Sequence, residues 1–272
     1  VSLGDMCFES CYMLEAIELP AGVTSLGSAC FSGCDRLKAI SLPKGITELG
    51  YQCFYACKSL TSVTLPASLT TMGESCFHGC SSVKFEGSLT ELKKRCFYHC
   101  TSLESIDIPQ GVRELGEECF SGCTSLMSVS LPDGITDLRS SCFSGCTALQ
   151  AITLPNSIDN IESRCFESCS ALESIVVPSG VTRLYEKCFS YCSKLASVTL
   201  PESIEKLYDD CFSNCTSLSG IALPAGLKNI GTGCFRNCSG LTSILLPRSV
   251  ETLGSGSFSD CTYPASGTTL TR

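Results

Sequence analysis

The sequence repeats one five-residue motif, Cys-Phe-x-x-Cys, at a nearly constant interval along its length. The first position of the motif stands at 7, 30, 53, 76, 96, 119, 142, 165, 188, 211, 234 and 257, so every step is 23 residues except one of 20. Ser257 replaces the first cysteine of the last copy, and all 23 cysteines belong to the motif. A fixed period of this length is typical of a repeat array whose units stack on one another.

The apolar spacing within a unit predicts its local structure, as residues 30–52 show. Ile40-Ser41-Leu42 alternates apolar and polar side chains, which is typical of a short strand with one buried face. The proline that follows ends the strand, because it cannot donate a hydrogen bond to a neighbouring strand. Ile46 and Leu49, three residues apart, fit a tight turn or a second short extended piece. The spacing in Cys30–Leu37 predicts one or two helical turns, partly 3₁₀.

A unit of this size cannot bury all its apolar side chains alone, so the coils must cover one another. Their strands then align as a parallel sheet. We expect a single solenoid of about twelve units over residues 1–262, followed by a polar tail at 263–272 where the repeat is lost. Glycine often follows the second apolar pair, as at Gly50, but Tyr185 stands there too, so a positive φ is not expected.

The charge and the hydropathy pattern disfavour two classes of partner. The net charge is -8 and the isoelectric point is about 4.9, so phosphate backbones and anionic lipids repel the surface. No apolar stretch approaches the roughly 20 residues that a membrane-spanning helix needs. The first residues show no signal-peptide pattern. We therefore expect neither nucleic-acid binding nor membrane insertion.

The cysteines allow four interpretations. They can form buried ladders of reduced thiols that act as small apolar side chains, or disulfides between neighbouring coils or within one motif. They can also bind a metal, or carry out redox catalysis. Three residues separate the two cysteines, which is neither the usual zinc spacing nor the Cys-x-x-Cys of redox enzymes. Buried thiols are favoured, because stacked coils need a small residue at the same place, and we expect no metal and no cofactor.

The pattern Leu-x-x-Ile-x-Leu-Pro-x-x-Val-x-x-Leu-Gly-x-x-Cys-Phe-x-x-Cys, as in Leu14 to Cys34, resembles the BspA-like class of leucine-rich repeats. The resemblance covers essentially the whole chain. It implies a curved right-handed solenoid with a parallel sheet on the concave face, and a secreted or cell-surface protein that binds host or matrix proteins. This chain differs in placing cysteine where the family usually has alanine. The family has no shared catalytic residues to carry over.

The outward positions of the predicted concave strand face are the candidate binding residues. They are Glu18, Ser41, Thr64, Lys84, Asp107, Ser130, Thr153, Val176, Thr199, Ala222 and Leu245. Small alanine or serine residues flank them, and the row becomes more apolar toward its end. An exposed apolar strip can mark a protein interface. The alternative is a neutral repeat surface that has no ligand.

Two further features suggest chemistry but have simpler explanations. His78 and His99 lie in adjacent motifs beside cysteines, so a Cys/His metal site or nucleophile can be imagined. Both occupy the variable positions of the motif, which should point outward as ordinary exposed residues. Asn214 and Asn237 begin glycosylation-type triplets, but the middle residue of each is a predicted core cysteine, so we interpret the matches as fortuitous.

The repeat is interrupted in three places. The unit of Cys80–Leu92 is three residues short, and its Phe85 is the only phenylalanine outside the motif, which predicts a local change in curvature or an indentation near residues 81–88. The chain begins inside a repeat and ends without an evident cap. Because an uncapped solenoid end exposes its core, we expect a fragment of a longer protein or a unit that assembles end to end.

These observations favour a non-enzymatic scaffold for protein binding or adhesion, secreted or displayed on a cell, that recognises a protein through its concave strand face. One alternative is a structural protein that self-associates through its uncapped ends. A third hypothesis, from another class, is a thiol-rich metal or redox protein.

Overall fold

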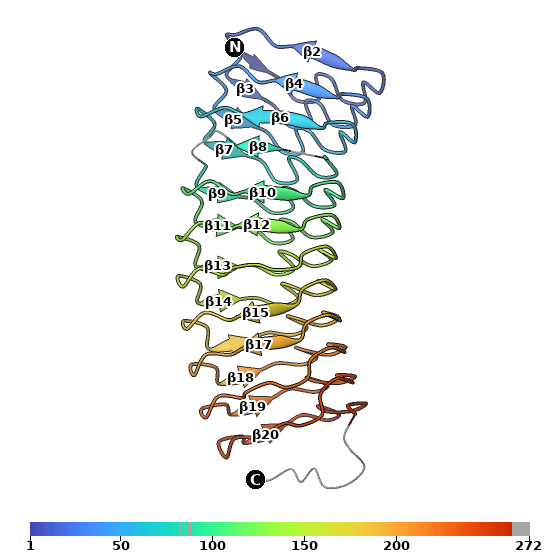
Figure 1. The fold of residues 1–272 in the computed structure, drawn as a ribbon. Coiled ribbons are helices and arrows are strands. Elements are labelled where there is room, and N and C mark those ends of the chain that lie inside the picture. The colour runs from blue at the N-terminus through green and yellow to red at the C-terminus, as the bar shows by residue number, and fades with distance from the viewer. Residues whose placement is uncertain (82, 86–88, 263–272) are drawn as a thin grey trace. The chain divides into compact units, whose positions relative to one another are not determined.

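The computed structural model describes residues 1–81, 83–85 and 89–262, and every regular element in this part of the chain is a short strand (Figure 1). The chain forms two compact units, Val1–Ile135 (unit 1) and a second that begins at Thr136 (unit 2). Each unit is a parallel β-solenoid, in which the chain coils repeatedly and the strands of successive coils pair side by side. The predicted tail at 263–272 lies outside the described residues.

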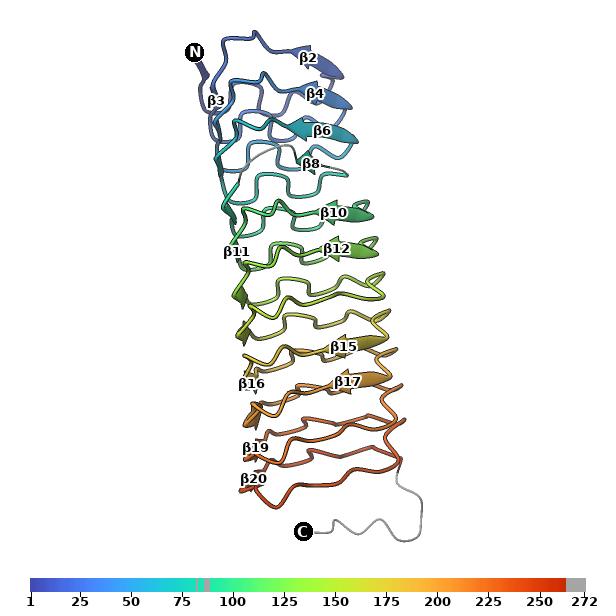
Figure 2. The same ribbon diagram turned by 60° about the vertical axis from the view of Figure 1, so that its left-hand side comes forward.

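A coil carries up to two strands, and each belongs to a separate series (Figure 2). The first series follows the predicted period-two pattern and comprises β2 (Ala16–Glu18), β4 (Ala39–Ser41), β6 (Ser62–Leu65), β8 (Lys84–Phe85), β10 (Ser105–Asp107), β12 (Ser128–Ser130), β15 (Ser174–Val176) and β17 (Ser197–Thr199). The second series comprises β1 (Ser2–Leu3), β3 (Ser25–Leu26), β5 (Glu48–Leu49), β7 (Thr71–Met72), β9 (Glu91–Leu92), β11 (Glu114–Leu115), β13 (Asp137–Leu138), β14 (Asn160–Ile161), β16 (Arg183–Leu184), β18 (Lys206–Leu207), β19 (Asn229–Ile230) and β20 (Thr252–Leu253). The second apolar pair is therefore an extended piece.

The register of the first series follows the sequence repeat. Ile17 pairs with Ile40, and Ile40 with Val63, at the 23-residue step. In the short unit Thr64 pairs with Lys84 at a step of 20, so β8 keeps the alignment despite the deletion. Phe85 packs edge-on against Phe97, with ring centroids 6.0 Å apart. The indentation predicted near residues 81–88 falls partly on Ser82 and 86–88, which lie outside the described residues.

The Cys-Phe-x-x-Cys segments form turns, and the prediction of helical turns there is wrong: no helix occurs in the described residues. The amide of Cys34 donates to the carbonyl of Phe31 within its own turn, at 3.2 Å, but the amide of Phe31 donates to the carbonyl of Cys53 on the next coil, at 2.8 Å. A helix keeps all such bonds inside one segment. Here the amides alternate between an acceptor in their own turn and an acceptor on the next coil. The bonds to the next coil form a third ladder between coils, while the apolar side chains are spaced as they would be in a helix.

Two backbone positions in every coil are left-handed. They are the residues before the two motif cysteines, such as Ala29 (φ 52°) and Gly33 (φ 72°), and all twelve motifs show both. Most of them are not glycine, although this conformation costs an ordinary residue about 1–2 kcal/mol. Gly50 has no positive φ, as predicted. A Cβ there would lie 2.5 Å from the carbonyl carbon of Gly27, so glycine serves close approach between coils.

The core is a stack of phenylalanine rings bordered by cysteine, leucine, isoleucine and valine. In unit 1 the rings of Phe31 and Phe54 lie parallel with centroids 5.5 Å apart, and in unit 2 those of Phe189 and Phe212 lie 5.4 Å apart. These four rings have no solvent-exposed surface. Full burial of each such side chain contributes about 1.5–3 kcal/mol, so the stacked motif supplies much of the stability.

Candidate interaction surface

The candidate site is the strand face, the outward positions of the first strand series and of the equivalent segments in the other coils. All eleven predicted binding residues are exposed there. Eight lie on strands: Glu18, Ser41, Thr64, Lys84, Asp107, Ser130, Val176 and Thr199. Thr153, Ala222 and Leu245 occupy the corresponding segments of unit 2, where no strand forms. Their assignment as a binding site stays a prediction.

Strand geometry explains why these side chains are presented to solvent. In β4, Ile40 turns into the core and is 5% exposed, while Ala39 and Ser41 on either side point outward. The residue before the buried one is small in most coils. Because this residue is small, it leaves space around the outward side chain two positions later on the same strand.

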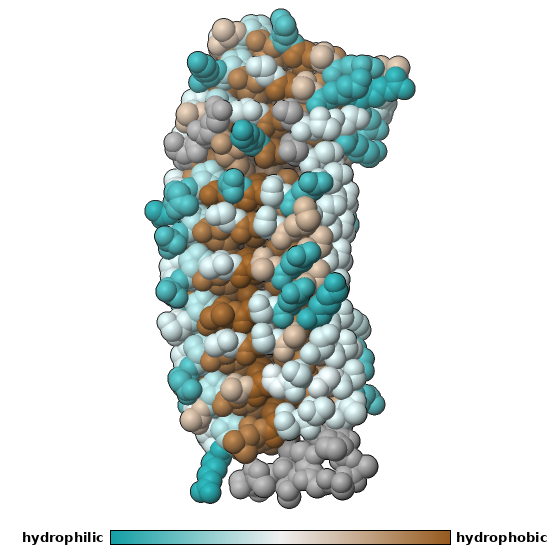
Figure 3. Space-filling model, in the orientation of Figure 1, coloured by the Kyte–Doolittle hydropathy of each residue, from teal (hydrophilic) through white to brown (hydrophobic). Residues whose placement is uncertain are grey.

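The strand face differs in chemistry between the two units. Unit 1 presents Glu18, Lys84 and Asp107 among hydroxyl groups, whereas unit 2 presents Val176 (64% exposed) and Leu245 (72% exposed). Figure 3 shows hydrophobic residues gathered in a strip along the strand-bearing side of each unit, with hydrophilic residues beside it. The contrast between the units therefore lies in the outward strand positions, which carry charge in unit 1 and large apolar side chains in unit 2.

The cysteines belong to the motif turns and not to the strand face. All 23 are thiols in the structure, and 20 of them are buried. The second cysteine of a motif donates its thiol hydrogen to the phenylalanine carbonyl of the preceding coil, as from Cys57 to Phe31, with an S–O distance of 3.1 Å. Sequence reasoning missed this bond. The signal was available, because the sequence keeps a weak donor at this position in every coil.

Burial makes these thiols poor nucleophiles. It raises the pKa of Cys34 to about 11 and that of Cys57 to about 12. Reactive cysteines need the opposite shift, toward the thiolate. Among the described residues, no group of three or more His, Cys, Asp or Glu side chains is placed to hold a metal ion. None of the described residues forms a helix suited to crossing a membrane.

His78 and His99 belong to a small aromatic cluster on unit 1. His99 is exposed, as predicted, but His78 is only half-exposed, because its ring lies between Tyr55 and Tyr98 at centroid distances of 4.4 and 5.0 Å. Burial lowers the pKa of His78, and the charges of His99 and Arg95 lower it further. Stacking at equivalent positions of successive coils created this cluster, which residue-by-residue reading of the motif did not reveal.

The two glycosylation-type triplets are structural neighbours. The amide nitrogen of Asn237 donates to the side-chain oxygen of Asn214 on the adjacent coil, at 2.7 Å. Cys215 and Cys238, the middle residues of the triplets, are fully buried, as predicted. The asparagine pair thus bridges two coils.

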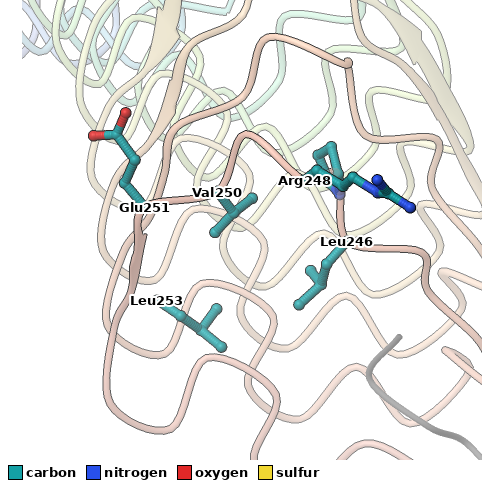
Figure 4. A pocket seen from close by; sticks show the side chains of 6 residues that line it. Leu246, Arg248, Val250, Glu251 and Leu253 are labelled. Carbon is teal, nitrogen blue, oxygen red and sulfur yellow. The ribbon is translucent and has the colours of Figure 1, made fainter. Parts of the chain in front are cut away.

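The coil that carries β20 exposes side chains of core type around a cavity of about 710 Å³ (Figure 4). Leu246, Val250 and Leu253 line it, and Glu251 and Arg248 extend away on opposite sides. Leu253 is 44% exposed, whereas the equivalent Ile230 is fully buried. The coil beginning at β1 likewise exposes apolar side chains, those of Met6, Tyr12 and Met13.

Comparisons with known proteins agree with this architecture. The family model for the BspA type leucine-rich repeat region matches six times, covering residues 1–87, 90–219 and 160–265. A leucine-rich repeat protein from Bacteroides ovatus is 27% identical over 96% of this chain and 80% of its own, with a TM-score of 0.63. A leucine-rich repeat protein from Eubacterium ventriosum (22% identical, 93% and 85% covered, TM-score 0.58) and the pneumococcal vaccine antigen PcpA (22%, 85% and 65%, TM-score 0.57) share the fold. A comparison with curated proteins finds no significant match.

Proposed function

Because this chain belongs to the BspA-type leucine-rich repeat family, we propose that it is a non-enzymatic scaffold that binds or adheres to a protein partner through the strand face. The observation that carries the proposal is the difference between the buried and the exposed positions of each coil. The cysteines and the phenylalanine of the motif are nearly identical from copy to copy, whereas the exposed strand position carries eight different residue types in eleven coils. A surface that varies on a constant frame is suited to recognising one particular partner.

The exposed apolar residues of unit 2 are the proposed anchor of the interface. Val176 on β15 lies beside Thr199 on β17, where the two strands pair in register. A large apolar side chain that is 64% exposed gains most when a partner removes it from water. Around this anchor, the hydroxyl groups of the neighbouring coils supply the polar rim that protein interfaces usually have.

We extend the proposal to location. The resemblance to BspA-like proteins implies a secreted or cell-surface protein, and one structure of the same fold is described as a pneumococcal vaccine antigen. An extracellular partner, such as a matrix or host-cell protein, is the kind of ligand that this location offers. The acidic net charge of -8 favours partners with basic surfaces.

The test is binding of the purified chain to immobilised fibronectin, collagen, laminin and fibrinogen, measured by biolayer interferometry. The double variant Val176→Arg, Thr199→Arg places two charges on the anchor. The matched control Ser217→Arg, Ser239→Arg adds the same charge at exposed positions beyond the motif. We expect the strand-face variant to lose at least tenfold in affinity and the control to stay within twofold. Unchanged binding by the strand-face variant, or no binding of the wild type to any of these proteins, contradicts the proposal.

A second candidate function, self-association, is favoured by the coils that carry β1 and β20. Leu253 and Cys7 are exposed there, although the equivalent Ile230 and Cys30 are fully buried between neighbouring coils. A second copy of this chain would cover them in the same way. Light scattering across a dilution series tests this candidate: we expect assembly that Leu253→Asp weakens, and a strict monomer at every concentration removes the candidate.

A further inference from the structure

The residues that directly follow the second strand series form a line of equivalent positions, which we call the post-strand positions. In unit 2 they include Tyr185, Tyr208, Gly231 and Gly254. The rings of Tyr185 and Tyr208 stack with centroids 5.4 Å apart and planes 12° from parallel. The next two coils continue this line with no side chain at all, so the aromatic stack stops at Tyr208.

A groove of about 260 Å³ opens where the stack stops. Its lining residues lie on or directly after β18, β19 and β20, the strands labelled in Figure 1. Tyr208 lines it, and Gly231 and Gly254 form part of its floor. Tyr185 is half-buried, but Tyr208 is 37% exposed. One face of the Tyr208 ring is covered by Tyr185, and the other has no ring stacked on it in the following coils.

With the backbone as it lies, neither Gly231 nor Gly254 leaves room for a side chain that would fill the groove. A Cβ at Gly231 would lie 2.5 Å from the carbonyl carbon of Tyr208 and from the amide nitrogen of Asp209. A Cβ at Gly254 would lie 2.3 Å from the amide nitrogen of Thr232. These are backbone atoms held in the ladder between coils, so they cannot move aside as a flexible side chain can. The open space beside Tyr208 is therefore a built feature of the fold.

A row of polar side chains borders the groove. Lys206 pairs in register with Asn229, and Asn229 with Thr252, so an ammonium, an amide and a hydroxyl group lie on successive strands about 4.8 Å apart. All three residues line the groove. Asp209 also lines it, with one carboxylate oxygen accepting a bond from the amide of Thr232 at 2.7 Å. The site combines one aromatic face with hydrogen-bonding groups that are neutral (Asn229, Thr252), cationic (Lys206) and anionic (Asp209).

We propose that this groove binds a pyranose sugar, which stacks its apolar C–H face on Tyr208 and directs its hydroxyl groups to Lys206, Asn229 and Thr252. A sugar ring has the required asymmetry, because one face is apolar and the edge carries hydrogen-bonding groups. An aromatic side chain from a peptide would match Tyr208 but would leave the polar row desolvated without partners, which costs binding energy. The site is separate from the strand face and does not depend on the function proposed for that face.

Unit 1 contains a natural comparison. Gly4, Gly27 and Gly50 leave a similar groove of about 280 Å³, bordered by Ser2, Ser25 and Glu48. No aromatic side chain lines this groove within the described part of the chain. Tyr51 lies next to it in the sequence and is 50% exposed, but it is not among the lining residues. If groove shape alone bound sugars, both units would bind; if Tyr208 is needed, only unit 2 should.

The experiment is saturation-transfer difference NMR of the whole chain with methyl glycosides of glucose, galactose, mannose, xylose, N-acetylglucosamine and glucuronic acid. We expect at least one to give strong signals from the C–H groups of one ring face. Titration calorimetry of that sugar should show affinity weakened about fivefold to tenfold by Tyr208→Ala, and less than threefold by Tyr208→Phe, which keeps the ring. Asn229→Ala should also weaken binding, because it removes a hydrogen bond to the sugar.

The control is Tyr51→Ala, which removes a tyrosine that is 50% exposed, against 37% for Tyr208, and that follows the unit 1 groove residue Gly50 in the sequence. It should leave affinity within twofold. Circular dichroism of each variant separates loss of binding from loss of fold, and Tyr208→Phe and Asn229→Ala keep the test valid if Tyr208→Ala unfolds. The proposal is overturned if no sugar in the set binds, if binding survives Tyr208→Ala, or if Tyr51→Ala weakens it equally. Preferential binding of p-cresol would also overturn it, by assigning the groove to an aromatic side chain.

Discussion

The motif turns and the strand face are made by the same repeat, yet they follow opposite rules. In the turns, successive coils carry the same side chains, Phe189 and Phe212 for example, and these are fully buried in contact with one another. On the strand face, Val176 and Thr199 occupy equivalent positions on paired strands but have different chemistry and are exposed. Identity between coils marks the positions where coils meet, and variation marks the positions that meet solvent or a partner.

This contrast shows that the most conspicuous feature of the sequence, the repeated cysteine motif, serves the packing of one coil on the next. Eleven pairs of cysteines and one single cysteine resemble a redox or metal centre, but the structure buries most of them between coils, where the second cysteine of a motif donates to a carbonyl oxygen. The residues on the strand face and at the post-strand positions vary from coil to coil and form no recognisable motif. The following predictions test this separation between buried frame and exposed surface.

The largest expected difference is in thiol reactivity. Burial raises the pKa of Cys57 to about 12 and lets little reagent reach it, so reaction requires the coils to open. Of the 23 cysteines, only Cys7 is exposed, while Cys11 and Cys261 are partly exposed. Titration with Ellman's reagent at pH 8 should therefore detect up to three thiols in the folded protein and 23 after denaturation.

Elemental analysis of the same sample completes this test. Rapid reaction of most thiols in the folded state contradicts the buried ladder. Stoichiometric metal, or fewer than 23 thiols after denaturation without reductant, would favour instead the metal or disulfide hypotheses that the cysteine pattern leaves open.

The next prediction compares truncation inside and outside the frame. Phe189→Ala removes a ring stacked between Phe166 and Phe212, at 5.4 Å from each, and should destabilise the protein by about 3–5 kcal/mol. Thr199→Ala, on the strand face, should change stability by less than about 0.5 kcal/mol. Urea unfolding followed by circular dichroism measures both. Similar losses for the two variants would mean that the strand face is part of the frame.

The sequence predicted most of the frame because the repeat carries its signals many times over. The 23-residue period, the strand at Ile40 and the proline after it indicate a stacked parallel solenoid. The pairing of Thr64 with Lys84 shows that the strand register persists across the three-residue deletion. The turns were mispredicted because apolar spacing reports which side chains are buried but not which coil accepts each amide hydrogen. The left-handed φ angles of Ala29 and Tyr191 could not be predicted either, because these residue types usually avoid that conformation and the sequence carries no signal for it.

The sites were less predictable for a related reason. The strand positions follow from alternation alone, so their exposure could be predicted. The stack of Tyr55, His78 and Tyr98, and the groove beside Tyr208, arise only when residues about 23 apart are placed side by side. Comparing equivalent positions between units, instead of reading each motif separately, would have revealed both.

The left-handed turn positions provide a matched pair of smaller effects. Ala56 has φ 56°, and the equivalent residue on the next coil is Gly79 with φ 72°. Ala56→Gly should stabilise the protein by about 0.5–1 kcal/mol, since glycine relieves the left-handed strain at the cost of a more flexible unfolded chain. Gly79→Ala should destabilise it by about 1 kcal/mol or more. Chemical unfolding of both variants checks the pair. If instead Ala56→Gly destabilised the protein and Gly79→Ala stabilised it, contacts made by the turns would outweigh the backbone preference.

The smallest expected effect concerns pH and the exposed side of the same turns. Burial against Tyr55 and Tyr98, with the positive charges of His99 and Arg95 nearby, holds the pKa of His78 below its ordinary value of 6.5. As the pH falls through 6.5 toward this lowered pKa, the unfolded chain takes up the proton before the folded protein does, so stability present at neutral pH is lost. The measurement compares two proteins, so that contributions from other groups cancel: the melting temperature should fall further between pH 7.5 and pH 5 in the wild type than in His78→Gln. Equal falls would show that the imidazole is solvated like any exposed side chain, and that the aromatic cluster belongs with the variable surface and contributes nothing to the frame.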